Sequence, residues 1–280
     1  VGKRNAFIEK DGKTVLSDSD FMIHFDRKKS KVVKEWDLAK HLDVSRDDLN
    51  FFRRGDWLHM NALEFDPRDS TIIVSGRNQG LLKVSWDDQL KWIMSPKQHW
   101  GKSGRKGKGY ETKPYLLTAV NNEGIPYSKD IQTGHKSADD FDFPWGPHAP
   151  SLLPNGNIIV FDNGPFRNYN NQKNYSRAVE YEVNEADKTF KQVWQYGKKR
   201  GAKLFSSIVS DVDLLPKTKN ILMTSGFVSP KDNHRAKVVE VSTKDNTEVF
   251  EATVFFKSIN KGNKPGWGQT DVLYLSLIHI

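Results

Sequence analysis

Two stretches of the 280-residue sequence place polar, chemically versatile side chains at the ends of short apolar segments. In the first stretch, His59 and Asn61 stand at the start of one apolar segment, and Arg77 follows the next one. An imidazole takes up or releases a proton near neutral pH, and a guanidinium group donates paired hydrogen bonds to oxyanions. Together, such residues are suited to holding and transferring a small anionic group.

The second stretch repeats this arrangement about ninety residues later. His148 stands at the start of an apolar segment, and Asn163 and Arg167 follow its partner segment in the sequence FDNGPFR. If both sets lie at one mouth of a common fold, two imidazoles and two guanidinium groups form a pocket for an oxyanion.

Ordinary structural roles compete with this interpretation. A histidine beside a tryptophan, as in DWLH, is often a packed or capping residue, and an arginine after a turn is often solvated. The repetition of the pair favours a site over these roles. Four other histidines lack such a repeat and receive no role: His24, His41, His99 and His135.

The elements around these residues follow a four-part pattern. After His59, short apolar segments separated by turn residues occupy 61–65, 70–75, 81–86 and 89–94, which predicts a four-stranded meander. The same pattern recurs twice, so we expect blades at 56–95, 146–197 and 206–256.

Repeated four-stranded meanders predict an all-β fold, a β-propeller, present as an incomplete fragment of about three to four blades. In a blade, the first strand is innermost and the second runs antiparallel beside it. The start of one strand and the end of the next therefore share a mouth, where both polar sets would meet. A sandwich or a barrel remains an alternative.

Three other segments surround these blades. We expect a partial blade at 1–50, with strands at 20–26 and 31–38 and a helix-like stretch at 39–49. Residues 96–145 are predicted to be an insertion.

The last six residues, 275–280 (LSLIHI), match a translated sequencing adaptor, so they are treated as a non-native tail. We expect an internal fragment of a longer protein.

Charge and composition restrict the partners only broadly. The net charge is +8 with no cysteine, which excludes disulfides and thiolate metal sites. Much of the excess charge lies in residues 97–113, a glycine-spaced basic stretch that is either a solvated loop or a grip on a phosphate backbone. No apolar run is long enough to span a membrane.

Four segments resemble the bacterial aryl-sulfate sulfotransferase (ASST) family and together cover roughly residues 5–255. They are DWLHMNALEFDPRDSTIIVSGRNQGLLKVSWDDQLKWIMSP, FDFPWGPHAPSLLPNGNIIVFDNG, YSRAVEYEVNEADKTFKQVWQYGKKRG and VVKEWDLAKHLD. The resemblance implies a six-bladed propeller that moves a sulfuryl group from one phenol to another, in the periplasm or at the cell surface. A homodimer is one option for its oligomeric state.

The resemblance also implies roles for individual residues. His59 and His148 correspond to histidines that contact the sulfuryl group or the phenolic oxygen, and Arg167 to the arginine that holds the sulfate oxygens. Arg77 and Asn163 would belong to the same shell. Asn61, two residues after His59, is a further substrate-binding candidate.

One stretch departs from the family pattern. The family's transiently sulfated histidine is expected near Phe227, Val228 and Ser229, and the nearest imidazole here is that of His234. Either the loop brings His234 to the site, or this branch lacks the covalent intermediate, or a part outside this chain supplies the nucleophile.

We expect an aryl sulfate donor, a phenolic acceptor and no cofactor, because no phosphate-cradling loop is present. A metal site is a weaker rival, since the histidines lack metal-ligand spacing and arginines would repel a dication. Trp57, Trp145 and Phe166 either stack on aryl rings or wedge between blades. The alternative from another class is a non-catalytic propeller that binds a sulfated ligand; a nucleic-acid binder ranks third.

Overall fold

The computed structural model describes residues 2–10, 12–49, 55–228, 235–256 and 272–273. Within these ranges, sixteen strands and a few short helical turns form the fold. The strands are arranged in four sheets, and the predicted all-β class with propeller-type blades is confirmed. The chain divides into unit 1, residues 1–146 and 183–191, and unit 2, residues 147–182 and 192–280.

The first sheet of unit 1 contains three strands, one more than the sequence predicted. They are β1 (Gly2–Lys10), β2 (Lys13–Asp26) and β3 (Lys31–Asp37), paired in sequence order. The helix-like stretch predicted at 39–49 is wrong, because only a 3-10 turn, η1 (Leu38–Lys40), forms there. The Asp43 side chain accepts bonds from the backbone nitrogens of Ser45 and Gly101 at 3.0 and 2.7 Å, which favours a turn over a helix.

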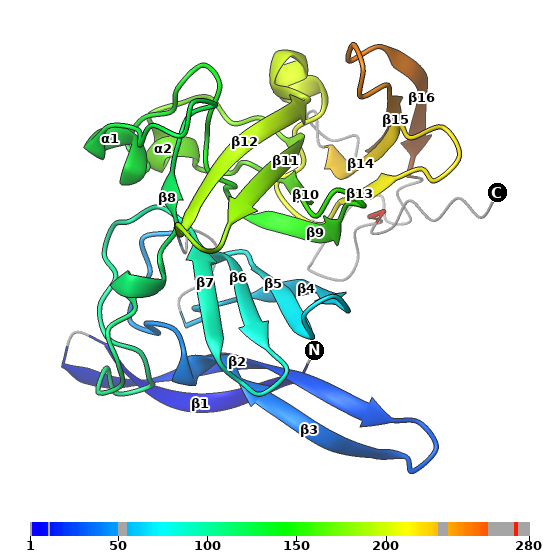
Figure 1. Ribbon diagram of the computed structural model, residues 1–280. Helices are drawn as coiled ribbons and strands as arrows, with labels where there is room; N and C mark the ends of the chain where they lie inside the picture. Colours follow the sequence, from blue (N-terminus) through cyan, green and yellow to red (C-terminus); the bar gives the residue numbers. More distant parts are fainter. Residues whose placement is uncertain (1, 11, 50–54, 229–234, 257–271, 274–280) are drawn as a thin grey trace, which may run out of the picture. The chain divides into compact units, whose positions relative to one another are not determined.

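The second sheet of unit 1 is the predicted four-stranded meander. It contains β4 (Met60–Asp66), β5 (Thr71–Gly76), β6 (Gly80–Ser85) and β7 (Leu90–Met94), hydrogen-bonded in that order (Figure 1). All six residues of β5 are buried. An apolar core joins this sheet to the first one and includes Met22 and Trp36 from the first sheet and Val74 and Leu82 from the second.

Between these blades and the next, residues 96–145 form loops with little regular structure. They contain the 3-10 turn η2 (Lys113–Tyr115), the two-residue strand β8 (Thr118–Ala119) and the single-turn helix α1 (Lys129–Gln132). β8 pairs in parallel with residues 189–190. The tip of a later hairpin, residues 183–191, thus belongs to unit 1.

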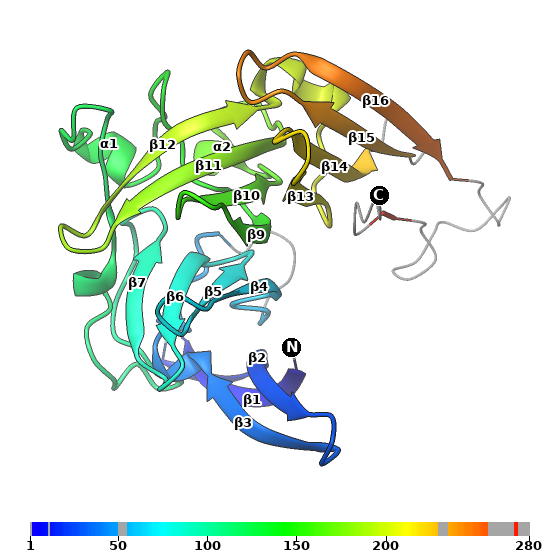
Figure 2. The ribbon, with the colours of Figure 1, turned by 45° about the vertical axis from the view of Figure 1, so that its right-hand side comes forward.

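Unit 2 contains two further meanders. The first has β9 (Pro147–Leu152), β10 (Ile158–Asp162), β11 (Arg177–Asn184) and β12 (Thr189–Tyr196), with β9 at one edge of the sheet. The second has β13 (Asp211–Leu214), β14 (Ile221–Val228), β15 (Arg235–Val241) and β16 (Glu248–Phe255), in that order (Figure 2).

A shared apolar core packs these two sheets against each other, with Ile159 and Phe161 from one and Met223 and Val239 from the other. Two short turns lie between the strands: α2 (Arg167–Asn170) and η3 (Lys198–Lys203). Each unit is therefore a pair of sheets that bury a common apolar face.

Candidate functional site

In unit 1, His59 and Arg77 lie at the same end of the β4–β5 pair. Met60 is paired with Gly76, and the backbone nitrogen of Arg77 donates to the carbonyl of His59 at 3.1 Å. His59 has a left-handed backbone, with φ of 49°, which is uncommon for a residue other than glycine. The antiparallel pairing thus brings together two residues that the sequence placed at separate strand ends.

A buried carboxylate, Asp56, links these two side chains. Its Oδ2 accepts a hydrogen bond from Nδ1 of His59 and lies 3.8 Å from Nη2 of Arg77. Asp56 and Arg77 are 2% and 6% exposed, whereas the His59 side chain is 23% exposed. The imidazole is therefore hydrogen-bonded to a buried carboxylate, while part of its side chain stays exposed.

Burial lowers the pKa of Arg77, and the charges of Asp56 and Asp20 oppose this effect. Asp20 also fixes the neighbouring backbone, since its Oδ2 accepts from the nitrogen of Met60 at 2.7 Å. The sequence prediction did not include Asp56. The available signal was its position three residues before His59.

Asn61 lies at an irregularity of β4. The register passes from Met60 opposite Gly76 to Ala62 opposite Ser75, so Asn61 is the extra residue of a β-bulge. It is half-buried. A bulge re-aims a side chain, which places Asn61 outside the regular alternation of the strand.

In unit 2, His148 lies within β9 and pairs with Phe161. The preceding pair, Pro147 with Asp162, corresponds to the Met60–Gly76 pair of unit 1. His59 therefore stands just before its first strand, whereas His148, 8% exposed, stands inside its own. The two histidines do not occupy the same pairing position, a difference that the sequence pattern did not reveal.

Asn163 is fully buried, and its side chain hydrogen-bonds to backbone carbonyl groups. Its Nδ2 donates to the carbonyls of Ser206 and Val209 at 2.6 and 2.9 Å, in the loop that leads into β13. Asn78 does the same in unit 1, where its Nδ2 donates to the carbonyl of Asp56 at 2.5 Å. The structure thus shows both asparagines bracing the loop before a first strand.

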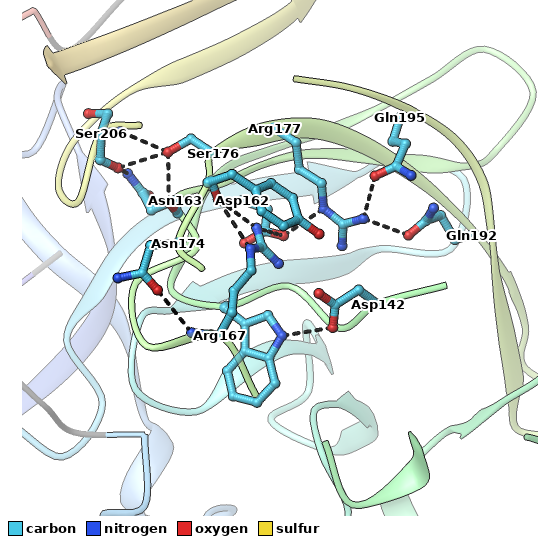
Figure 3. A network of polar contacts seen from close by, with 12 residues as sticks. Asp142, Asp162, Asn163, Arg167, Asn174, Ser176, Arg177, Gln192, Gln195 and Ser206 are labelled. Carbon is cyan, nitrogen blue, oxygen red and sulfur yellow. Dashed lines mark hydrogen bonds and ion pairs between the residues drawn. The ribbon is translucent and has the colours of Figure 1, made fainter. Parts of the chain in front are cut away.

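Arg167 is also fully buried, and its guanidinium is held on several sides (Figure 3). Nη2 donates to Oδ2 of Asp162 at 2.8 Å, and Nε and Nη2 donate to the carbonyl of Tyr175 at 3.1 and 2.9 Å. The guanidinium carbon lies 3.7 Å from the centre of the Tyr175 ring. Gly164, with φ of +71°, gives the guanidinium room, because a Cβ there would meet Nη2 at 2.5 Å.

A second buried arginine, Arg177, shares the same carboxylate. Its Nε donates to Oδ2 of Asp162 at 2.8 Å, and its Nη1 donates to the side-chain oxygens of Gln192 and Gln195 at 2.8 and 2.7 Å. Figure 3 shows Asp162 between the two guanidinium groups. The sequence prediction omitted Arg177, although its place at the start of a strand in SRAVEYEV parallels the other polar strand ends.

His234 lies outside the described residues. Near the end of β14, the backbone nitrogens of Phe227 and Gly226 donate to the hydroxyl oxygens of Ser206 and Ser210 at 2.9 and 3.0 Å. These bonds fix the C-terminal end of β14.

The two tryptophans considered as aryl-stacking residues are core residues instead. Trp57 and Trp145 are 2% and 1% exposed, and Trp57 packs in the apolar core of unit 1. Phe166 is half-buried and adopts a left-handed backbone, with φ of 56°. Of the three candidates, only Phe166 is not buried.

Among the residues that the structure describes, no three histidine or carboxylate side chains gather closely enough to hold a metal ion. None of the helices in the described ranges has the length and apolar character that a membrane crossing requires.

Blades of four antiparallel strands, with imidazole and guanidinium groups at their strand ends, define a propeller-type protein. The chain belongs to the arylsulfotransferase (ASST) family, whose model matches residues 1–263. It is 30% identical over 267 residues to the arylsulfate sulfotransferase AssT of Lelliottia amnigena, covering 82% of this chain and 43% of that protein. It is 31% identical over 251 residues to AssT of Escherichia coli O6:H1 strain CFT073, covering 76% and 40%.

The chain thus spans less than half the length of these relatives. Among solved structures, it is similar to a putative 6-phosphogluconolactonase from Bacteroides uniformis, with a TM-score of 0.37 and 12% identity over 85% of this chain and 51% of that one. It is also similar to the Dos1 propeller, with a TM-score of 0.33 and 9% identity over 81% and 54%.

Proposed function

We propose that the protein containing this chain is an aryl-sulfate sulfotransferase, which moves a sulfuryl group from a phenolic sulfate ester to a phenolic acceptor without a nucleotide. The supporting observation is the partly exposed imidazole of His59, fixed by buried Asp56 beside Arg77, in a chain related to named arylsulfate sulfotransferases. We also propose that the protein is exported to the periplasm or the cell surface.

The donor step breaks the S–O bond of the aryl sulfate. The aryl oxygen keeps the bonding electron pair and takes up a proton, while the sulfuryl group bonds to a nucleophilic nitrogen. We propose a ping-pong reaction through a sulfohistidine, with His234 as the candidate nucleophile. In the acceptor step, the phenol gives its proton to an imidazole, its oxygen bonds to sulfur, and the S–N electron pair returns to nitrogen.

The residues take separate roles in this scheme. His59 and His148 handle the phenolic proton or contact the sulfuryl group, and Arg167 and Arg77 supply positive charge for its oxygens. Asn163 acts by holding the loop before β13, and Asn61 by contacting substrate. Charge that develops on the sulfuryl oxygens and the leaving phenolate is stabilised most by donors that are already fixed in place.

Turnover of a chromogenic aryl sulfate by the full-length protein, with phenol as acceptor, tests this proposal. The wild type is expected to release the chromogenic phenol and form phenyl sulfate, and the His59→Gln variant to do so about 10²- to 10⁴-fold more slowly. Incubation with donor alone is expected to add the mass of a sulfuryl group to the peptide with His234. An increment on another residue, or none despite turnover, removes His234 from the mechanism.

A second candidate, a non-catalytic propeller that binds a sulfated ligand, is favoured by one observation. The guanidinium of Arg167 is fully buried among Asp162 and the carbonyl of Tyr175, as a structural residue would be. Tight binding of an aryl sulfate to the full-length protein without formation of product would select this candidate.

A further inference from the structure

His59 has two ring nitrogens in different surroundings. Nδ1 faces Oδ2 of the buried Asp56, while the side chain as a whole stays 23% exposed. A carboxylate oxygen accepts hydrogen bonds but cannot donate them, so contact with Asp56 requires a proton on Nδ1. In the neutral ring, Nε2 then carries the lone pair.

The position of Asp56 is fixed independently of His59. Its backbone carbonyl accepts from Nδ2 of Asn78 at 2.5 Å, and Nη2 of Arg77 lies 3.8 Å from its Oδ2. The His59 backbone is fixed too, by the bond from the nitrogen of Arg77 to its carbonyl at 3.1 Å. The carboxylate and the imidazole are therefore both anchored before any substrate arrives.

We propose that Asp56 is a positioning residue that keeps the proton of neutral His59 on Nδ1 and leaves Nε2 as the acceptor for the phenolic proton. This inference rests on the proposed sulfuryl transfer. The phenolic O–H bond breaks, its proton goes to Nε2, and the oxygen electron pair forms the new O–S bond. The loaded imidazole is positively charged and remains paired with the carboxylate.

The test uses the full-length protein and the variant Asp56→Asn. An amide can donate to Nδ1 as well as accept from it, so the wrong tautomer becomes available. We expect kcat to fall about 10²- to 10⁴-fold, with KM changed far less. In 15N-histidine-labelled protein at alkaline pH, the His59 ring signals, assigned by their loss in His59→Gln, are expected to shift from the Nδ1-protonated toward the Nε2-protonated form.

Asp66→Asn is the matched control, because Asp66 ends β4 at the opposite end from His59, is 1% exposed and pairs with Arg68. It is expected to keep both the wild-type kcat and the His59 tautomer. A reduction of kcat in both variants, with an unchanged His59 tautomer, would show that Asp56 acts only through the general stability of the blade and would overturn the inference.

The two proposals fail in different ways. Absence of turnover in the wild type would contradict the sulfotransferase assignment. The 15N spectra would still show whether Asp56 sets the tautomer of His59. Conversely, a wild type that turns over while Asp56→Asn retains the Nδ1-protonated ring and full kcat removes the positioning role alone.

Discussion

The carboxylates Asp56 and Asp162 are both buried and both bind side chains at strand ends, but they leave those side chains in different states. Asp56 contacts the imidazole of His59, whose side chain is 23% exposed. The Oδ2 atom of Asp56 also lies 3.8 Å from Nη2 of Arg77. Asp162, fully buried, binds Arg167 and Arg177 at 2.8 Å each, and both arginines are almost completely buried as well. The first arrangement leaves an imidazole partly exposed, and the second buries both guanidinium groups.

In the proposed catalytic site, this difference in burial would separate a group that exchanges protons from groups that supply fixed charge. A group that exchanges protons must reach the substrate, whereas a fixed charge acts through its field and requires rigidity more than access. It follows that changes around Asp162 should mainly reduce stability, and changes around Asp56 should mainly reduce activity.

Gly164→Ala is expected to have the largest effect. A Cβ at this position would meet the carbonyl of Tyr175 at 1.9 Å and Nη2 of Arg167 at 2.5 Å, on a backbone with φ of +71°. Urea unfolding should show a loss of about 4 kcal/mol or more.

The matched control for this change is Gly124→Ala. Its φ is +80°, and a Cβ there meets nothing within 4 Å, so only the backbone cost of about 1–2 kcal/mol is expected. Equal losses in the two variants would mean that the Tyr175 carbonyl and the guanidinium of Arg167 both move away at no cost, so that the cluster is not rigidly held.

Arg177→Met should follow, with a loss of about 3–5 kcal/mol, because it removes one partner of a buried ion pair. The methionine also leaves the side-chain oxygens of Gln192 and Gln195 without their bonds to Nη1, which are 2.8 and 2.7 Å long. Urea unfolding measures the loss. A loss below about 1 kcal/mol, as for a surface pair, would contradict the rigid character of this cluster.

His59→Gln should cost about 1 kcal/mol or less, since its side chain is partly exposed and its loss opens no large cavity. Its effect on turnover is expected to be large, a decrease of about 10²- to 10⁴-fold. The same protein preparation serves for urea unfolding and for the aryl sulfate assay. A large loss of stability with little loss of turnover would reverse the assignment of roles between the two clusters.

The smallest effect is expected at the Asp66–Arg68 pair. The hydrogen bond from Arg68 lowers the pKa of Asp66 below its ordinary value of 3.8. The carboxylate therefore adds stability above pH 3.8, and this contribution is lost as the pH falls through the lower, folded-state value. The free energies of unfolding of wild type and Arg68→Ala, measured with urea, should differ slightly near neutral pH, by about 0.2–1 kcal/mol, and converge in acid.

The sequence was sufficient for the strand order of the blades, because segments such as the fully buried β5 are apolar and end at clear turn residues. It was insufficient for β1, whose edge position and polar residues weaken the apolar pattern. The turn after Leu38 was mistaken for a helix because the bonds of the Asp43 side chain are not visible as a periodicity.

Part of the site could be predicted in the same way. The closeness of His59 and Arg77 follows from antiparallel pairing. The different pairing position of His148 does not, because a histidine before a strand and one inside a strand look the same in the sequence pattern. The roles of the shared carboxylates Asp56 and Asp162 were also not predicted. The sequence alone does not show whether an aspartate before or at the end of a strand is buried or solvated.

Unit 1 is assembled from two separate parts of the sequence, with consequences for its synthesis. Lys83 is 6% exposed, and its ammonium group lies 2.6 Å from the carboxylate of Glu185, which follows 102 positions later. At about 5–20 residues per second, the ribosome adds Glu185 roughly 5 to 20 s after Lys83. The first blades of the nascent chain are therefore completed only when the hairpin tip, residues 183–191, has been synthesised. A ribosome that stalls before residue 185 leaves Lys83 without the carboxylate of Glu185.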